Sequence, residues 1–200
     1  MGCPTIQTAR LVLRPLARDD TEVLAALHAE ESFWHYPYRR GWTHDETQRF
    51  IDRSLELHES GSFALSAVAL REGGDLIGWA GLSIPFFLPE VLPAVEVGWR
   101  LGEQYRRHGF ATEAGEAWVQ HGFEHHALAE IVSIYDPENT ASGAVMRRLG
   151  FEVGQEAVHP MNGVRLHVMK LARSTWLDAA RQARSRLQGS PDPPSTNAGR

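Results

Sequence analysis

The stretch that decides the fold reads Arg106-Arg107-His108-Gly109-Phe110-Ala111-Thr112-Glu113-Ala114. A strand-like run ends just before it, and apolar residues at helical spacing follow from Gly109 to about His126. The N-terminus of a helix exposes unpaired N–H groups and a partial positive charge, so it favours a bound anion. Gly109 permits a tight turn and the close approach of a ligand. The pattern alone leaves two interpretations open: a site for an anion such as a diphosphate, or a helix start beside a surface arginine pair.

Strand-like and helix-like segments alternate on both sides of this stretch. Thr43 and Glu46 have the spacing of a capping box, which predicts a helix that runs to about Glu59. We expect strands at 9–16, 62–70, 76–84, 94–101, 129–135, 151–158 and 164–171, and helices at 19–29, 43–59, 109–126, 139–149 and 175–187. The segments predict an α/β (α+β) layer architecture, with a mixed sheet of about seven strands and roughly four flanking helices.

Composition narrows the class of protein. The chain has 200 residues, of which 42% are hydrophobic and 22% charged, as expected for one globular domain, here residues 1–187. Residues 188–200 are rich in Pro, Ser and Gly and are predicted to be a disordered tail. The net charge of −5 argues against nucleic acid as a partner. No apolar run reaches 18 residues and no signal peptide is visible, so we expect a cytoplasmic protein without membrane contact.

The reactive side chains exclude several chemistries. Lys170 is the only lysine among 20 cationic residues, and no Gly-Lys-Ser/Thr phosphate loop exists. A Schiff-base mechanism needs a lysine nucleophile, and only Lys170 could serve. Cys3 is the only cysteine, which excludes an internal disulfide and a cysteine-based zinc site. His121 and His125 lie four apart on a predicted helix, but no third ligand is evident, so we expect no metal.

The segment Arg106 to Ala111 resembles the R/Q-x-x-G-x-G/A loop of the GNAT superfamily of acetyl-CoA-dependent N-acetyltransferases. Other segments resemble its RimJ/RimL-like branch, the ribosomal-protein N-acetyltransferase type: Thr8 to Leu16, Ile77 to Gly81, Thr112 to Ala114, Pro137 to Ser142 and Leu149 to Phe151. The resemblance covers residues 8–171. It implies the GNAT fold, a mixed and mostly antiparallel sheet with one strand pair splayed at the cofactor.

The resemblance also implies which residues hold acetyl-CoA. The backbone N–H groups of the loop would bind the coenzyme A pyrophosphate, beside the charge of Arg106; they belong to Arg107, His108, Gly109, Phe110, Ala111 and Thr112. The backbone of the splayed strand, at Trp99, Arg100 and Leu101, would pair with the pantetheine arm. Asn139 would bind the same arm, with Ser142 one helical turn away. Without the resemblance, Asn139 and Ser142 indicate a helix N-cap and its first turn.

The implied reaction is direct transfer of the acetyl group to a primary amine through a tetrahedral intermediate. Glu96 is a candidate general base, and its alternative role is an ion pair with an arginine such as Arg100. Many family members carry a tyrosine acid where this chain has Met146, which cannot donate a proton. Ser142, Tyr135 or water could take that role. Because of this departure, a catalytically silent acyl-CoA-binding or regulatory domain of the same fold is the alternative to an N-acetyltransferase.

Two apolar segments suggest where the acceptor binds. Phe33, Trp34, Tyr36 and Tyr38 lie between the first two predicted helices, where the resemblance implies an acceptor wall; the alternative is a packed cap over the core. The loop from Pro85 to Pro93 could line the acceptor groove, form a homodimer contact or cover the edge of the sheet. The acceptor itself is expected to be a peptide or protein N-terminus or a small-molecule amine.

Overall fold

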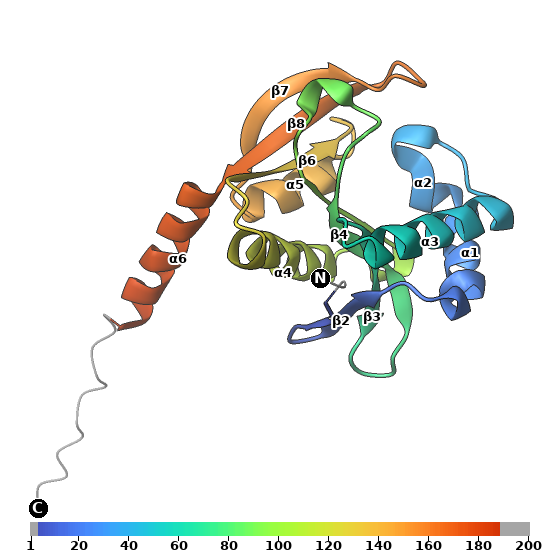
Figure 1. Cartoon of the computed structure of the whole chain (residues 1–200), viewed down its shortest axis with the longest axis horizontal. Coiled ribbons are helices and arrows are strands. Elements are labelled where there is room, and N and C mark those ends of the chain that lie inside the picture. The colour runs from blue at the N-terminus through green and yellow to red at the C-terminus, as the bar shows by residue number, and fades with distance from the viewer. Residues whose placement is uncertain (1–3, 189–200) are drawn as a thin grey trace, which may run out of the picture.

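A single eight-stranded sheet organises the computed structural model, which describes residues 4–188 (Figure 1). The order across the sheet is β1-β2-β3-β4-β5-β6-β8-β7, and only the β5–β6 pair is parallel. The strands are β1 (Ile6–Gln7), β2 (Leu11–Pro15), β3 (Leu65–Leu70), β4 (Leu76–Ser83), β5 (Glu96–Leu101), β6 (Glu130–Tyr135), β7 (Glu152–Val158) and β8 (Arg165–Ala172). The predicted mixed, mostly antiparallel sheet is confirmed, with eight strands rather than about seven.

The described residues form six α-helices: α1 (Thr21–Ala29), α2 (Glu31–Tyr38), α3 (His44–Glu59), α4 (Phe110–His125), α5 (Thr140–Arg148) and α6 (Arg173–Gln188), the last of which extends away from the sheet (Figure 1). The predicted capping box of α3 is confirmed, since Thr43 Oγ1 accepts from the Glu46 N–H and the Glu46 carboxylate accepts from the Thr43 N–H. The predicted tail lies outside the described residues except for Gln188, which is the last residue of α6.

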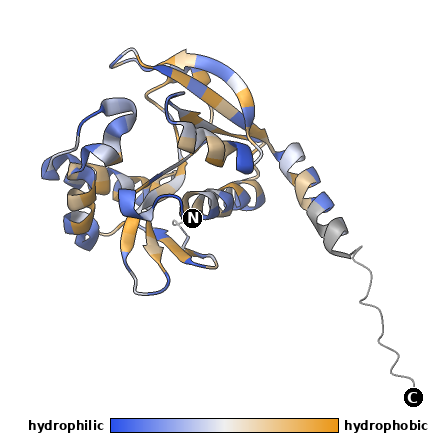
Figure 2. Ribbon diagram, turned by 180° about the vertical axis from the view of Figure 1, so that it is seen from behind, coloured by the Kyte–Doolittle hydropathy of each residue, from blue (hydrophilic) through white to orange (hydrophobic). Residues whose placement is uncertain are grey.

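Buried apolar residues divide between the two faces of the sheet. The ribbon in Figure 2 carries its hydrophobic colour mainly along the strands and on parts of the helices. Alternation along β5 sends Val97 to the face that α4 covers, where it packs with Trp118 and Phe123. The opposite face carries Trp79 of β4, which packs against residues of α1, α2 and α3. The middle of the sheet is therefore covered on both faces, and Glu96, Gly98 and Arg100 point toward α1–α3.

Helix α2 occupies the segment expected to be an aromatic loop, and it is kinked at Trp34 and Tyr36. Pro37 lacks the N–H that would bond the Phe33 carbonyl in a regular helix. The guanidinium of Arg100 supplies the missing donor, with 2.5 Å to the Phe33 oxygen and 2.9 Å to the Tyr36 oxygen. A short-range sequence pattern could not show this helix, because a residue of β5 stabilises its broken turn.

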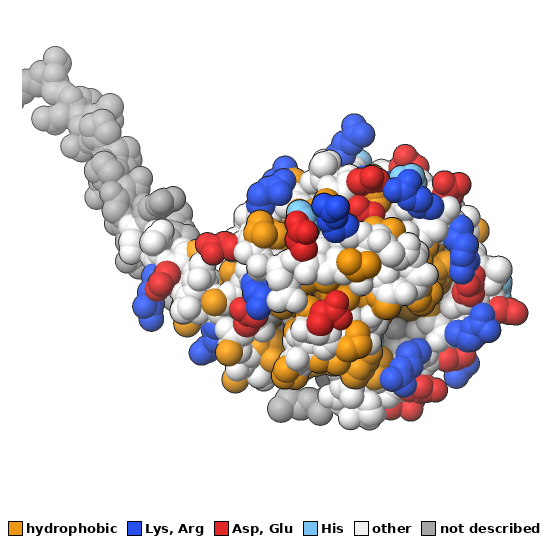
Figure 3. Space-filling model, turned by 90° about the horizontal axis from the view of Figure 1, so that it is seen from above, with side chains coloured by type: hydrophobic (Ala, Val, Ile, Leu, Met, Phe, Trp, Pro, Cys, Tyr) orange, Lys and Arg blue, Asp and Glu red, His pale blue; other side chains and the backbone are white. Residues whose placement is uncertain are grey.

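Several large apolar side chains remain on the surface of the described part of the chain, among them Phe86, Val158 and Met161. Figure 3 shows apolar side chains in a band between charged groups on one side of the molecule. Leu88, in the predicted proline-rich loop, is fully buried against strand residues such as Val132 and Val168, so this loop covers part of the sheet. The homodimer contact stays a prediction. Among the described residues, no helix is long and apolar enough to cross a membrane.

Candidate active site

Strands β5 and β6 touch at one point and then part. Their single register pair joins Glu96 and Val132, where the Val132 N–H donates to the Val95 carbonyl at 2.9 Å. At the next residues of β6, hydrogen bonds to side chains replace the backbone hydrogen bonds between the two strands. The Ser133 hydroxyl donates to the Val97 carbonyl at 2.8 Å, and the Ile134 N–H donates to the Glu96 carboxylate. A parallel ladder would pair the Ile134 N–H with that same Val97 carbonyl, so these two side chains account for the splay.

The gap between the two strands exposes backbone polar groups of β5. Main-chain groups alternate in direction along a strand, and the N–H of Gly102 points to β4, where it bonds the Ile77 carbonyl. Trp99 and Leu101, at odd spacing from Gly102, therefore direct their N–H and C=O groups into the gap. The splayed pair predicted at the cofactor is present in the sheet. On the open side of β5 the Leu101 carbonyl accepts from Arg106 Nε at 3.4 Å, and the Trp99 groups and the Leu101 N–H face the gap.

The loop before α4 has the geometry of an anion cradle. Arg107 and Gly109 adopt left-handed backbone, with φ of 63° and 81°. Within the described structure, the backbone N–H groups of Arg107 to Thr112 donate to no protein acceptor, and the first intrahelical bond comes from Glu113 to Gly109. The residues present therefore fit a pyrophosphate, held by six consecutive main-chain donors at the positive end of a 16-residue helix.

A brace from the N-terminal segment fixes this loop. The Arg10 guanidinium bonds the Glu113 carboxylate at 2.7 Å and the His108 carbonyl at 2.8 Å, and the Thr8 hydroxyl donates to Glu113 at 2.6 Å. Burial would raise the pKa of Glu113, but the hydrogen bonds from Thr8 and Arg10 outweigh that effect and lower it. The brace gives a physical reason for the resemblance at both Thr8–Leu16 and Thr112–Ala114, since the two segments bind each other.

Arg106 and Arg100, both predicted near the cofactor, direct their guanidinium groups toward α2. Arg106 donates to the Ser32 carbonyl at 2.6 Å, while Arg100 stacks over the Trp34 ring at 4.3 Å. Burial lowers the pKa of Arg100 to about 10. The Arg100 side chain thus donates to backbone carbonyls of α2, and the ion pair between Arg100 and Glu96 that the sequence left open does not form.

Glu96 is a partly buried carboxylate with no cationic partner among the described residues. Burial raises its pKa to about 7, and the hydrogen bond from the Ile134 N–H opposes this only in part. Its neighbour on the same face, Gly98, has no heavy atom within 4 Å of the position a Cβ would occupy. The carboxylate therefore borders an open space beside the splay, which suits a group that accepts a proton near neutral pH.

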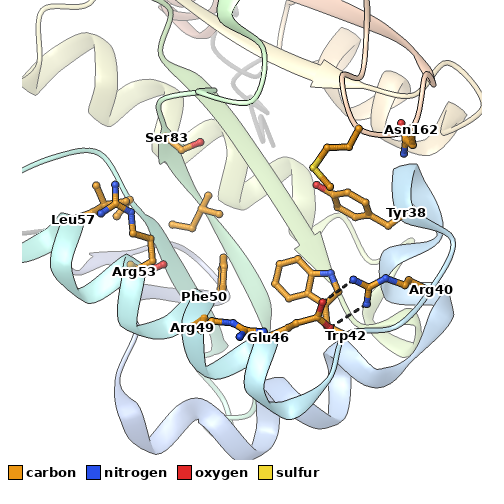
Figure 4. Close-up of a pocket in the computed structure, with 14 residues that line it drawn as sticks. Tyr38, Arg40, Trp42, Glu46, Arg49, Phe50, Arg53, Leu57, Ser83 and Asn162 are labelled. Carbon is orange, nitrogen blue, oxygen red and sulfur yellow. Dashed lines mark hydrogen bonds and ion pairs between the residues drawn. The ribbon is translucent and has the colours of Figure 1, made fainter.

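A cavity of about 650 Å³ opens on this face of the sheet (Figure 4). Its lining comes from the end of α2, from α3, from β3, β4 and the β7–β8 turn: Tyr38, Arg40, Trp42, Glu46, Arg49, Phe50, Arg53, Ser54, Leu57, Ala64, Leu65, Ser83, Met161 and Asn162. Ser83 is the register partner of Glu96. Burial raises the pKa of Tyr38, and the charge of Glu96 adds to that rise. The cavity thus adjoins the Glu96 carboxylate.

The four predicted acceptor residues divide between core and cavity. Tyr38 lines the cavity, while the structure puts Phe33 and Trp34 in the core, with 1% and 3% of their surface exposed. Phe33 and Trp34 therefore pack as part of a cap over the core, which was the alternative to an acceptor wall. Tyr36 is partly buried and donates to the Glu138 carbonyl at 3.2 Å. Sequence reasoning missed Arg49 and Arg53, although their spacing of four on a predicted helix puts them on one face.

The remaining predicted residues lie around α5. Asn139 caps this helix, accepting from the Ser142 N–H at 3.1 Å, so its amide nitrogen stays available to a ligand. Met146 is 2% exposed and packs in the core, so the position where many family members carry a tyrosine acid holds a side chain without a proton to donate. The Tyr135 hydroxyl lies 3.4 Å from His167 Nδ1 and packs beside Gly143. The roles predicted for Ser142, Asn139 and Tyr135 stay predictions.

The histidine pair considered for a metal gives no such site within residues 4–188, where no group of three or more His, Cys, Asp or Glu side chains could hold an ion. The rings of His121 and His125 contact each other, with centroids 4.7 Å apart. Burial lowers the pKa of His121, and the neighbouring histidines add to that effect.

Comparison with known proteins decides the family. Residues 10–152 match the family model described as the acetyltransferase (GNAT) domain. The chain is a GNAT acetyltransferase. This GNAT acetyltransferase is similar to the uncharacterized N-acetyltransferase p20 of Bacillus licheniformis, with 28% identity over 153 residues that cover 74% of this chain and 82% of the relative.

Solved structures agree with this GNAT assignment. A GNAT-family acetyltransferase from Bacillus anthracis superposes with a TM-score of 0.73 at 22% identity, covering 86% of this chain and 99% of the other. RimL, a ribosomal L7/L12 alpha-N-protein acetyltransferase solved in complex with coenzyme A, gives 0.69 at 17% identity, with 82% and 95% covered. The predicted GNAT family is confirmed, and with it acetyl-CoA as the cofactor of this GNAT acetyltransferase. The RimJ/RimL-like branch stays a prediction, since the structural neighbours of that type agree in fold.

Proposed function

We propose that this GNAT acetyltransferase transfers the acetyl group directly from acetyl-CoA to a primary amine, with an α-amine as the preferred acceptor. The observation that carries the proposal is Glu96, a carboxylate that burial holds at a pKa of about 7, bordering an open space at Gly98. A general base works best when its pKa lies near the working pH.

The backbone around the splay supplies the other functions. The six free N–H groups from Arg107 to Thr112 would hold the pyrophosphate, and the Asn139 amide nitrogen would bind the pantetheine arm. Bound acetyl-CoA supplies the activated thioester carbonyl. The Trp99 N–H points into the gap and is a candidate donor to the acyl oxygen, where negative charge develops during transfer. No lysine or cysteine is needed for these roles.

Free-energy arithmetic favours an α-amine over a lysine side chain. An amine with a pKa of about 10.4 costs roughly 4.6 kcal/mol to deprotonate at pH 7, whereas one with a pKa near 8 costs roughly 1.4 kcal/mol. Among the described residues Glu96 is the candidate base in this space, and a carboxylate with a pKa of about 7 accepts a proton more readily from an amine of lower pKa. The lower cost therefore points to a peptide N-terminus or the α-amine of a small molecule.

Thiol release from acetyl-CoA, measured with a panel of α-amines and side-chain amines, tests the proposal. We expect release that depends on an added α-amine and exceeds that with lysine side chains or polyamines. A silent acyl-CoA-binding domain would instead bind the coenzyme, seen by calorimetry, and release no thiol with any amine. Better turnover of polyamines than of peptide N-termini would contradict the preference for an α-amine.

A further inference from the structure

The cavity beside Glu96 carries an excess of positive charge. Four of its lining residues are ionised at neutral pH: Arg40, Glu46, Arg49 and Arg53. Three are cations and one is an anion, and no histidine or lysine lines it. In Figure 4 these side chains lie along one side of the cavity, on α3 and on the segment that leads into it. A cavity that is net positive in an otherwise acidic protein favours a ligand with negative charge.

The single carboxylate of the lining is already neutralised. Glu46 accepts from both terminal nitrogens of Arg40, at 2.6 Å and 3.0 Å, and from the Thr43 N–H at 2.8 Å. These contacts lower the pKa of Glu46 to about 2, with the Arg40 hydrogen bond as the largest cause. Arg40 and Glu46 therefore cancel, and neither is free to pair with a ligand.

Arg49 and Arg53 are left to set the charge of the cavity. They lie four residues apart on α3, so they share one face of the helix. Arg49 has no acidic partner within the described residues, and Arg53 contacts only the exposed Glu56, at 3.3 Å. Each guanidinium is a planar fork of N–H donors that can bind a carboxylate with two hydrogen bonds, and this helix face carries two of them.

We propose that Arg49 and Arg53 select an acceptor amine that carries a carboxylate several atoms from its nucleophilic nitrogen. The inference rests on the proposed function, because it takes the cavity as the acceptor site. The nitrogen lies at the Ser83–Glu96 end, and the carboxylate lies at the two arginines. Trp42, Phe50 and Leu57 form the apolar wall along which the linking atoms pack.

The size of the cavity fits this class of acceptor. A volume of about 650 Å³ lies within the range of roughly 300–1,000 Å³ that small-molecule sites have. It accommodates an amino acid or the first residues of a peptide. The carboxylate could therefore come from an acidic small molecule or from an acidic side chain near a peptide N-terminus, and both present the same chemistry to the arginines.

Two matched acceptor pairs test the inference on the full chain. The peptide amides Ser-Glu-Glu-Phe and Ser-Gln-Gln-Phe form one pair, and glutamate and glutamine form the other. We expect kcat/KM to favour the acidic member of at least one pair by about tenfold at low salt, and the preference to shrink as salt rises. A preference in the peptide pair identifies a peptide terminus as the source, and one in the amino-acid pair identifies a small molecule.

Variants of α3 separate the cavity from general electrostatics. In Arg49→Gln/Arg53→Gln the acidic preference should disappear, and in Arg49→Glu/Arg53→Glu it should reverse. The control Arg148→Gln/Arg181→Gln removes the same charge from exposed sites on α5 and α6, and it should retain the preference. Equal turnover of both members of each pair, or an unchanged preference in the α3 variants, would overturn the inference and leave the proposed function standing. Bound coenzyme without release for any amine would overturn the proposed function itself.

Discussion

The hydroxyl of Ser133 donates to the carbonyl of Val97 across the gap between β6 and β5, at 2.8 Å. Both residues are fully buried, so this bond replaces the ladder bond that a regular parallel pair would make. It leaves the Ile134 N–H to the Glu96 carboxylate and thereby links the opening of the sheet to the candidate base.

Ser133→Ala should lower the free energy of unfolding by about 1–2 kcal/mol, because a buried carbonyl loses its donor. Urea denaturation would measure the loss. Ser62→Ala is the control, since Ser62 is exposed and bonds only a neighbouring hydroxyl; it should change stability little. Equal stability of wild type and Ser133→Ala would show that the carbonyl finds another donor.

Glu96→Gln should reduce kcat/KM for the acceptor by about a hundredfold or more, the usual contribution of a general base. In the wild type, kcat/KM should rise with pH and level off above about pH 7, because only the carboxylate accepts a proton. Glu152→Gln, which removes an exposed carboxylate from β7, is the control. An unchanged pH profile in Glu96→Gln would exclude Glu96 as the base.

Glu96→Gln should also be more stable than the wild type at high pH. The pKa of Glu96 in the folded state, about 7, lies above the unfolded value of 4.5. Ionisation therefore costs the folded state free energy, and the loss develops as pH rises from 4.5 to 7 and is complete above 7. We expect the free energy of unfolding of Glu96→Gln to exceed that of the wild type by about 1–3 kcal/mol at pH 8, and to differ little from it at pH 4. Denaturation at both pH values measures this, and a stability difference independent of pH would contradict it.

Gly109→Trp should abolish coenzyme A binding while the chain still folds. Gly109 has φ of 81°, and a Cβ there would lie 3.3 Å from the Arg10 guanidinium that braces the loop. Gly74→Trp is a matched control, because Gly74 has φ of 77° and open space around it in the β3–β4 turn. Both variants carry a similar left-handed strain of about 1–2 kcal/mol. Calorimetry should detect coenzyme binding only in the control, and undiminished affinity in Gly109→Trp would refute the loop assignment.

Gly98→Leu should block the acceptor while the coenzyme still binds. The open space at Gly98 lies beside Glu96, so a larger side chain would fill the position the amine must reach. A misplaced nucleophile costs about a hundredfold in rate. Gly98→Ala should give a smaller loss, and a coenzyme affinity unchanged in both variants would separate acceptor blocking from damage to the fold. If Gly98→Leu retains full turnover, the acceptor does not use this space.

Local patterns in the sequence predicted most of the elements. The capping box at Thr43 and Glu46, and Gly109 before α4, specify helix starts through contacts within a few residues, so they can be recognised without the fold. Helix α2 escaped prediction because its Phe33 carbonyl bonds Arg100, 67 residues away. Arg49 and Arg53 escaped prediction for a similar reason. The sequence shows their helical spacing, but it does not show that they line a cavity or which acidic groups lie near them.

By itself, the sequence determined the family, the order of strands and helices, and the loop whose main chain can hold a pyrophosphate. These follow from short-range chemistry, since periodicity, caps and a glycine at left-handed φ act over a few residues. Only the tertiary structure decided what Glu96 and Arg100 do. The Arg100 side chain donates to carbonyl groups of α2, so it does not pair with Glu96. Burial then raises the pKa of Glu96 to about 7. Desolvation depends on what packs around a group from distant parts of the chain, and no local pattern records it.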